Sequence, residues 1–171
     1  ELSHSEVIIV YGVDLGKLLP TLGGVVLRAK LLNGAKLIVI GERRQRLAEN
    51  ADYFLQTKPG TETVLYGAMA KVIIDRGLMD LTFINERCGG YESFLSKATD
   101  FDLLSAAETC GVAAELIEAA AVAYGQARSA AILYSTGAEC RTSETVQALV
   151  KDRKRHTSAL QSHLNILSRL L

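Results

Sequence analysis

The sequence has three cysteines, two prolines and no tryptophan in 171 residues. The cysteine count is odd, and Cys88, Cys110 and Cys140 show no Cys-x-x-Cys spacing. Both facts argue against a disulfide framework and against a paired-cysteine zinc site. We therefore expect a reducing, cytoplasmic setting, with each thiol a small buried residue. Cys140 has the most interest for function because it follows a predicted strand.

Long apolar runs and an excess of charge of either sign are also missing. Apolar stretches such as Val7–Val10 and Leu37–Ile40 are far shorter than the ~18 residues that a membrane-spanning helix needs. Lys and Arg number 19 and are balanced by 19 Asp and Glu, so the chain has no general attraction for nucleic acid or acidic lipid. We expect a soluble protein with no nucleic-acid partner and no direct membrane insertion.

The apolar content, in contrast, is high. Apolar residues make up 49% of the chain, and this length is usual for a single domain with one core. The sequence opens at Glu1 rather than Met, without a basic region followed by an apolar one, which is the pattern of a secretory signal. We expect a piece cut from a longer protein.

The first forty residues predict a strand, a helix and a second strand. Val7–Tyr11 and Leu37–Ile40 are short β-branched runs closed by Gly12 and Gly41, which is typical of buried strands. Between them, after a loop that ends at Pro20, apolar residues recur at helical steps, and Asn33-Gly34 supplies a stop. These apolar residues are Leu22, Val25, Val26, Ala29 and Leu32. The pattern indicates a right-handed parallel βαβ unit.

The rest of the chain extends this pattern. We expect a charged helix over Arg44–Asn50 and a third strand over Asp52–Gln56. A helix over Thr61–Asp75 has Thr61 as its N-cap, and Leu78–Gln126 is helical with breaks at glycine. The breaks fall at Gly77, Gly89-Gly90 and Gly111; a fourth strand follows over Ala130–Tyr134 and a helix over Thr142–Val150. The predicted fold is α/β and doubly wound: a mostly parallel, Rossmann-like sheet with helices on both faces and a helical insertion.

Residues 151–171 differ in character from residues 1–150. Residues 151–156 are a basic run, which is more typical of a solvated surface than of a docking segment. The leucines that follow fall on one helical stripe: Leu160, Leu164, Leu167 and Leu171. We therefore divide the chain into a domain over 1–150 and a basic, leucine-rich helical tail over 151–171. The tail is either divergent or foreign to the parent protein.

Ligands of doubly wound folds bind beyond the carboxyl ends of the strands. Gly12 allows a ligand to approach the backbone closely, although residues 12–16 lack the full glycine fingerprint of dinucleotide-binding loops. Glu42, just after the second strand, is placed to accept hydrogen bonds from a ribose or a guanine edge; a solvated loop carboxylate is an equal alternative. The segments at these strand ends are 12–14, 41–43, 58–62 and 135–140.

A second candidate site is the turn Lys58-Pro59-Gly60-Thr61. It opens a predicted helix, whose free N–H groups together with Lys58 could hold a phosphate, although a purely structural turn is the favoured interpretation. The histidines lie near the chain ends, and no triad, metal-binding motif or phosphate-binding loop appears. We therefore predict no catalytic residue and no metal ligand.

Several of these segments together resemble a known family. The run over 33–40 followed by Arg43-Arg44, then residues 47–52 and 58–62, is similar to the molybdopterin oxidoreductases, with formate dehydrogenase catalytic subunits the nearest in style. Residues 68–74, 83–84, 110–112 and 130–134 continue the pattern in the same order. The resemblance covers roughly residues 5–150. The same segment is similar to the molybdopterin-type subunit of bacterial NADH:quinone oxidoreductase (NADH dehydrogenase).

The resemblance implies a domain that binds a cofactor but does not catalyse by itself. In this family the domain holds one guanosine diphosphate arm of bis(molybdopterin guanine dinucleotide). The parent would be an oxidoreductase subunit acting in electron transfer, with its remaining domains and iron–sulfur electron-transfer subunits as partners, and the isolated chain would be inactive. The implied contacts are Gly12, Val13 and Asp14 for the pyrophosphate, Glu42 and Arg43 for the guanosine, Lys58, Gly60, Thr61 and Glu62 for the nucleoside, and Ser135 and Gly137 for the pterin side.

Two departures from the family pattern suggest an alternative function for this domain. The family commonly has Asn where this chain has Asp14, and Asp-Pro-Arg where it has Gly41-Glu42-Arg43. A carboxylate at Asp14 would repel a pyrophosphate by about 1 kcal/mol or more in a partly screened site. The alternative is a structural domain without cofactor, of the type found in the molybdopterin-type subunit of NADH:quinone oxidoreductase.

Overall fold

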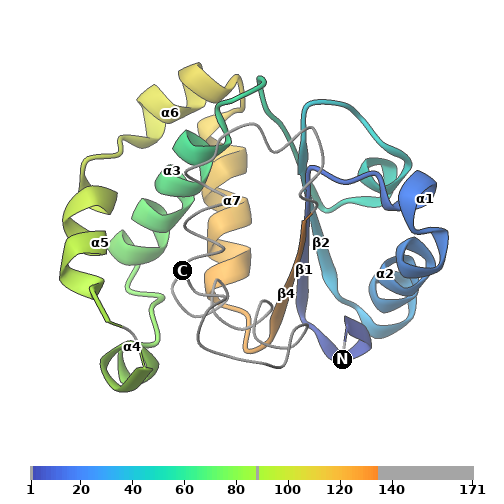
Figure 1. Cartoon of the computed structure of the whole chain (residues 1–171), viewed down its shortest axis with the longest axis horizontal. Helices are drawn as coiled ribbons and strands as arrows, with labels where there is room; N and C mark the ends of the chain where they lie inside the picture. Colours follow the sequence, from blue (N-terminus) through green and yellow to red (C-terminus); the bar gives the residue numbers. More distant parts are fainter. Residues whose placement is uncertain (1, 88, 135–171) are drawn as a thin grey trace.

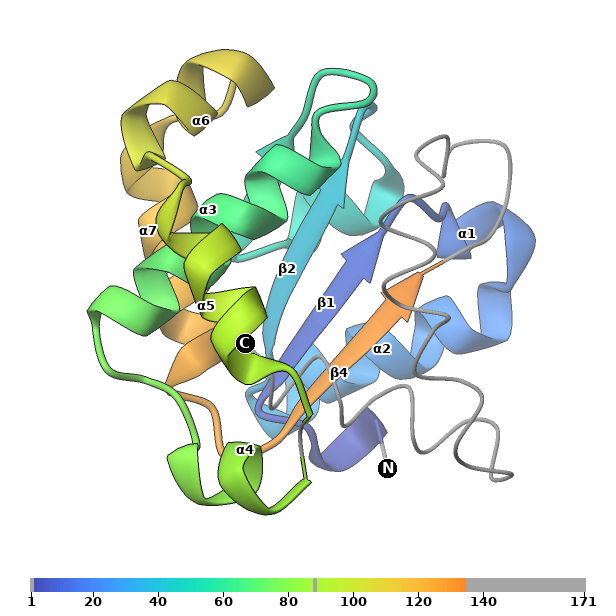
Figure 2. The same ribbon diagram turned by 60° about the vertical axis from the view of Figure 1, so that its left-hand side comes forward.

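The computed structural model describes residues 2–87 and 89–134, in which four parallel strands form one sheet. The spatial order is β3-β2-β1-β4, and Figure 2 shows β2, β1 and β4 running in the same direction. The strands are β1 (Val7–Tyr11), β2 (Lys36–Gly41), β3 (Tyr53–Gln56) and β4 (Ala130–Tyr134). All four predicted strands are confirmed to within one residue at each end.

The strand β1 lies in the middle of this sheet. Val7 is in register with Lys36 of β2 on one side and with Ala130 of β4 on the other. Every residue of β1 is buried, as are the last five residues of β2. A strand that is covered on both faces needs a continuous apolar run, which explains why these two segments stand out in the sequence.

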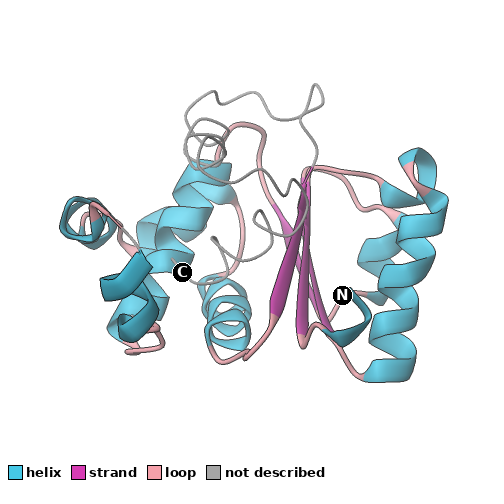
Figure 3. Cartoon of the chain, turned by 60° about the horizontal axis from the view of Figure 1, so that its bottom comes forward, coloured by secondary structure: helices cyan, strands magenta, loops and turns pink. Residues whose placement is uncertain are grey.

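Helices cover both faces of the sheet, so the molecule has three layers (Figures 1 and 3). One face carries a 3-10 helix η1 (Leu2–His4), α1 (Leu15–Leu18), α2 (Pro20–Asn33) and a second 3-10 helix η2 (Arg46–Asn50). The other face carries α3 (Glu62–Asp75) and α7 (Ala114–Gly125). Beyond α3 lie α4 (Leu81–Arg87), α5 (Tyr91–Thr99) and α6 (Leu103–Cys110). The predicted α/β class with helices on both faces is confirmed.

The described residues form two apolar clusters, one on each face of the sheet. Side chains of β1 alternate between them because successive residues of a strand point to opposite faces. Val7, Ile9 and Tyr11 pack with α3 and α7, whereas Ile8 and Val10 pack with α2 and η2. No helix of the described residues is long and apolar enough to cross a membrane.

Three local expectations about the first half of the chain were wrong. The charged segment over 44–50 forms only the short 3-10 helix η2, because Gln45 has extended backbone angles and the link from β2 to β3 is brief. The predicted loop before Pro20 contains α1, and Pro20 is the first residue of α2. Leu32 does not join the buried stripe of α2; it is 75% exposed in the last turn.

The helices between residues 62 and 125 end at the predicted glycine breaks, and there is one further break that was not predicted. Gly111 has φ +73° and forms the left-handed cap of α6, which is the conformation that favours glycine at a helix end. An unexpected break falls over 100–102, between α5 and α6. The carboxylate of Asp102 accepts a hydrogen bond from the Ser105 N–H (2.8 Å) and so begins α6; side-chain capping of this kind favours a new helix start.

Two helical glycines are expected to affect stability in opposite directions when replaced. A Cβ on Gly67, in α3, would lie 2.4 Å from the ring of Phe101, whereas a Cβ on Gly24, in α2, would meet nothing within 4 Å. We expect Gly67→Ala to displace the Phe101 ring and to cost about 1–3 kcal/mol. Gly24→Ala should stabilise by about 0.5–1 kcal/mol, because alanine loses less conformational freedom in a helix. Urea denaturation of the two variants checks both signs, and equal effects would contradict the Phe101 contact.

Asp52 ties the loop before β3 to its neighbours. Its carboxylate accepts from the Lys30 ammonium of α2 and from the Leu37 N–H of β2 (2.7 Å). Burial raises the pKa of Asp52, but the bonds from Lys30 and Leu37 outweigh this effect and leave the pKa lowered. A lowered pKa contributes stability that is present above the unfolded value of about 3.9 and is lost as the pH falls through the folded pKa.

We therefore expect Asp52→Asn to be less stable than the parent chain at pH 7 and nearly equal to it near pH 2. Urea midpoints at the two pH values measure the difference. The exposed Asp100→Asn is the control, which should match the parent at both. A loss that persists unchanged at low pH would mean that Asp52 acts by its shape and not by its charge.

Candidate functional site

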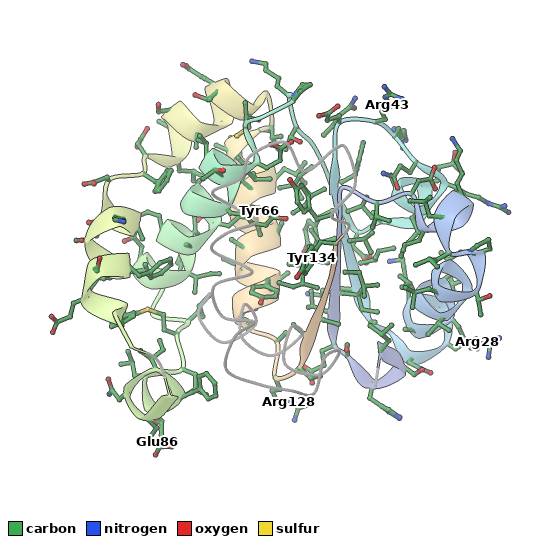
Figure 4. The ribbon with its side chains drawn as sticks, in the orientation of Figure 1. Arg28, Arg43, Tyr66, Glu86, Arg128 and Tyr134 are labelled. Carbon is green, nitrogen blue, oxygen red and sulfur yellow. The ribbon has the colours of Figure 1, made fainter. Side chains whose placement is uncertain are left out.

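The carboxyl ends of β1, β2 and β3 lie side by side at one edge of the sheet, and Arg43 marks this edge in Figure 4. The Gly12 N–H donates to the Ile40 carbonyl (3.1 Å), and the Thr57 N–H donates to the Gly41 carbonyl (3.2 Å). Because neighbouring strands are spaced about 4.8 Å apart, the ends of β1 and β3 are separated by about 10 Å. The predicted segments 12–14, 41–43 and 58–62 therefore share one edge.

The strand order places a switch point beside β1. The chain leaves β1 to form α2 on one face, and it returns to β4, on the other side of β1, through α3–α7 on the opposite face. Open parallel sheets bind ligands in the crevice at such a point, beyond the carboxyl ends of the strands. The residues that follow β1 lie at this switch point. Ser135 and Gly137, which follow β4, lie outside the described residues.

The backbone is open at the end of β1. Gly12 has φ +59°, and a Cβ there would meet nothing within 4 Å, so a ligand can approach the main chain. Val13 is buried. The Asp14 carboxylate caps the short helix α1 by accepting from the Lys17 N–H (3.3 Å), and it forms an ion pair with the Lys17 ammonium (3.6 Å). Asp14 is thus engaged with its own helix.

The end of β2 is formed by a buried Gly41 and a half-buried Glu42. The Glu42 carbonyl accepts from the Gln56 side-chain amide (3.1 Å), which fixes the loop to the end of β3. Arg43 is exposed and lies at this edge of the molecule (Figure 4). Its guanidinium is therefore available to a ligand at the strand ends.

The turn after β3 has structural contacts of its own. Thr61 occupies the predicted N-cap position of α3, but its hydroxyl donates to the Lys58 carbonyl (2.7 Å) and makes no side-chain cap. The Lys58 ammonium donates to the Glu108 carbonyl (3.0 Å) in the last turn of α6, where a cation is favoured by the helix dipole. The contact observed for Lys58 is therefore structural, and its role toward phosphate stays a prediction.

Glu62 is the buried acid of this edge. It is 4% exposed at the first position of α3, and its Oε1 accepts from the Gly60 N–H (3.4 Å). A carboxylate in the first turn of a helix is stabilised by the helix dipole. The two oxygens of a carboxylate offer about four acceptor positions, so Glu62 has capacity for further hydrogen-bond donors.

Cys110 lies beneath the same turn. Its thiol is fully buried and donates to the Thr61 carbonyl (3.3 Å). Burial raises the pKa of the Cys110 thiol, and the nearby Glu62 charge raises it further. The thiol therefore stays protonated and inert, as predicted for a small buried residue. Cys88 and Cys140 lie outside the described residues.

Sequence reasoning missed two polar groups at this edge. The Gln45 Oε1 and the Thr57 Oγ1 are both buried and have no hydrogen-bond partner within the part of the chain that the structure describes. Their positions soon after β2 and β3 are a weak signal in the sequence, but no pattern reveals that an atom lacks a partner. Such atoms are exceptions in folded proteins and commonly mark a ligand or a water.

A sizeable cavity lies at the opposite edge of the sheet. This cleft of about 600 Å³ is found at the amino edge and is lined by none of the predicted site residues. In Figure 4 Arg128 marks that edge, opposite Arg43. Within residues 2–87 and 89–134, no group of three or more His, Cys, Asp or Glu side chains is placed to hold a metal ion.

The open backbone after β1 and the buried acid after β3 lie at the carboxyl edge of a doubly wound α/β sheet, where domains of this class bind their ligands. Similarity to known proteins is more specific. The family model described as molybdopterin oxidoreductase matches residues 1–151. The chain belongs to the molybdopterin oxidoreductase family.

The relatives are much longer than this chain. The alpha subunit of an F420-dependent formate dehydrogenase of Methanocaldococcus jannaschii is 36% identical over 137 residues, covering 80% of this chain and 20% of the relative. Formate dehydrogenase H of Escherichia coli is 34% identical, covering 80% of this chain and 19% of the relative. The solved acetylene hydratase of Pelobacter acetylenicus has a TM-score of 0.74 and 30% identity, covering 79% of this chain and 19% of that one. The chain spans about a fifth of these relatives.

The family implies a molybdopterin cofactor in the parent enzyme, and the residues at the strand ends have groups that could bind part of such a ligand. Glu62 offers buried acceptor oxygens, Gly12 leaves the main chain open, and two orphaned polar atoms lie near β2 and β3. The Asp14 carboxylate is unfavourable for a pyrophosphate, but its ion pair with Lys17 offsets its charge.

Proposed function

We propose that this chain holds one guanosine diphosphate arm of a bis(molybdopterin guanine dinucleotide) cofactor within a formate dehydrogenase-like oxidoreductase subunit. The observation that carries the proposal is Glu62, an acid that is 4% exposed at the carboxyl edge of the sheet. A buried charge is costly unless a partner satisfies it. The bond from the Gly60 N–H, at 3.4 Å, leaves room for a ligand that donates hydrogen bonds.

Guanine is the base with matching donors. Its N1–H and its 2-amino group lie side by side, so that both can donate to the two oxygens of one carboxylate. Adenine has an acceptor at N1 and no amino group at C2. This edge of adenine therefore offers no donor to the Glu62 carboxylate. The acid therefore favours guanine over adenine.

Other residues would hold the remaining parts of the arm. The open backbone of Gly12, followed by Val13, would meet the pyrophosphate, with Asp14 beside it, while Glu42 and the exposed Arg43 would border the nucleoside. Gly60 and Thr61 lead into Glu62, and Lys58 anchors their turn to α6. Ser135 and Gly137 remain the predicted contacts on the pterin side.

The bound cofactor would supply the redox chemistry of the parent enzyme, and the residues of this chain would position and shield its nucleotide. The names of the relatives support this division, because a formate dehydrogenase, an assimilatory nitrate reductase and an acetylene hydratase act on different substrates yet share this domain. A shared domain carries what such proteins have in common rather than what distinguishes them. We further propose a cytoplasmic setting, with the other domains and iron–sulfur subunits as partners.

Isothermal titration of the 171-residue chain with GDP and with ADP tests the proposal. We expect GDP to bind at least about tenfold more tightly than ADP, which corresponds to about 1.4 kcal/mol from the paired donors. The chain by itself should not oxidise formate. Equal affinities, or no binding of GDP, would contradict the cofactor-holding role.

A cofactor-free structural domain, as in the molybdopterin-type subunit of NADH:quinone oxidoreductase, is the second candidate. One observation favours it: the Asp14 carboxylate stands where a pyrophosphate is expected and is used to cap α1. This candidate predicts that the chain binds no guanine nucleotide, so the same titration separates the two functions.

A further inference from the structure

Two buried polar atoms flank one residue at the end of β2, and neither has a partner among the described residues. The Thr57 N–H donates to the Gly41 carbonyl (3.2 Å), and the Gln45 Nε2 lies 3.8 Å from the position that a Cβ on Gly41 would occupy. The Thr57 Oγ1 and the Gln45 Oε1 are the unpartnered atoms. A further such atom, the Tyr124 hydroxyl, lies in the last turn of α7, which leads to the opposite edge of the sheet.

Leaving these two atoms unpaired has a measurable cost. A buried donor or acceptor without a partner is destabilising, and Thr57 is only 3% exposed. Both atoms lie at the carboxyl edge, where ligands of this fold bind. Gly41 adds no side chain that could pair with either atom, and a Cβ there would meet the Gln45 Nε2 at 3.8 Å. The missing partner is therefore a group that both donates and accepts hydrogen bonds.

A ribose hydroxyl is such a group. In doubly wound folds a polar side chain at the end of the second strand contacts the ribose of a bound nucleotide. Here the last residue of β2 is Gly41, which has no side chain for this contact, and Glu42 after it is the competing candidate. The amide oxygen of Gln45 accepts a hydrogen bond, whereas the hydroxyl of Thr57 donates one and accepts another.

We infer that Gln45 and Thr57 bind the ribose hydroxyls of the nucleotide, across the gap left by Gly41. The inference rests on the proposed function, because it assigns part of the same guanosine arm to these residues. It makes the two side chains specificity-determining residues for a ribonucleotide over a deoxyribonucleotide.

The test compares GDP with 2′,3′-dideoxy-GDP, which lacks both hydroxyls. We expect the parent chain to bind GDP at least about tenfold more tightly, because a site built to bond a hydroxyl rejects the analogue that lacks it. In the double variant Gln45→Met, Thr57→Val this ratio should fall to within about twofold. The thermal midpoint of the variant should stay equal or rise, because two unpaired polar atoms are removed.

The double variant Gln126→Met, Thr99→Val is the matched control, since both residues lie outside the strand-end segments. It should keep the parent's ratio. A parent chain that binds both nucleotides equally would overturn this inference and leave the proposed function standing. If Glu42→Gln lost the preference for GDP over 2′,3′-dideoxy-GDP while the Gln45, Thr57 double variant kept it, Glu42 would be the ribose contact and this inference would be overturned. A parent chain that does not bind GDP would overturn the proposed function and this inference together.

Discussion

Glu62→Gln is expected to lower the affinity of the chain for GDP by about 10- to 100-fold. A buried amide presents one acceptor and one donor group where the carboxylate presents two acceptors. One of the two guanine donors then faces the amide N–H₂ and loses its bond, and a bidentate contact of this kind is worth about 1–3 kcal/mol. Isothermal titration of the parent and variant chains measures the loss.

The same substitution should change which base is preferred. Xanthine carries a carbonyl at C2 in place of the guanine amino group, so the amide N–H₂ of Glu62→Gln can donate to it while the amide oxygen accepts from N1–H. We therefore expect the variant to bind xanthosine diphosphate more tightly than GDP. Glu92→Gln, at an exposed position in α5, is the control and should keep the parent's preference. If Glu62→Gln weakened both nucleotides equally, Glu62 would support the turn and would not contact the base.

Ile38→Ala should give the largest loss of stability. Ile38 lies in β2 with no exposed surface and belongs to the core cluster that packs against α3 and α7. Removing its branched side chain leaves a cavity in a close-packed layer, at a cost of about 2–5 kcal/mol. We expect a clearly lower urea midpoint with an unchanged slope, because the surface exposed on unfolding is nearly the same.

Leu32→Ala provides the comparison. Leu32 has the same apolar character but is 75% exposed at the end of α2, so its removal should change the free energy of unfolding by less than about 0.5 kcal/mol. A loss at Leu32 as large as that at Ile38 would show that another surface covers this turn of α2 in solution.

The strands could be predicted because each one is an apolar run with a clear end. All of Val7–Tyr11 and residues 37–41 of β2 are buried. A strand covered on both faces needs a continuous apolar run, which is visible in the sequence. The order of the strands could not be derived from such runs. The pairing of β1 with β4 depends on packing between residues that are far apart in the chain, such as Val7 and Ala130.

Local helix details were harder to predict for physical reasons. Periodicity gave Leu32 a place on the apolar stripe of α2, but its side chain is 75% exposed in the last turn of the helix. The break at 100–102 contains no glycine. It depends on Asp102, whose carboxylate caps α6, and an aspartate is common enough in loops to give little warning.

The candidate site could be located but not detailed. The strand-end rule placed Gly12, Glu42 and the turn before Glu62 at one edge, and the structure puts their segments there. The strand-end rule could not predict that the Lys58 ammonium donates to a carbonyl of α6, or that Gln45 and Thr57 each have a buried atom without a hydrogen-bond partner among the described residues. Both facts depend on atomic contacts that sequence spacing does not fix.

The central place of β1 has a consequence for the synthesis of the protein. One neighbour of β1, the strand β2, is made soon after it, but the other, β4, begins only at Ala130. Until the ribosome has added β4, β1 presents an unpaired, wholly apolar edge to solvent, and such edges template aggregation. Nascent or truncated chains that stop within the helical stretch between β3 and β4 are therefore the species that most need a chaperone.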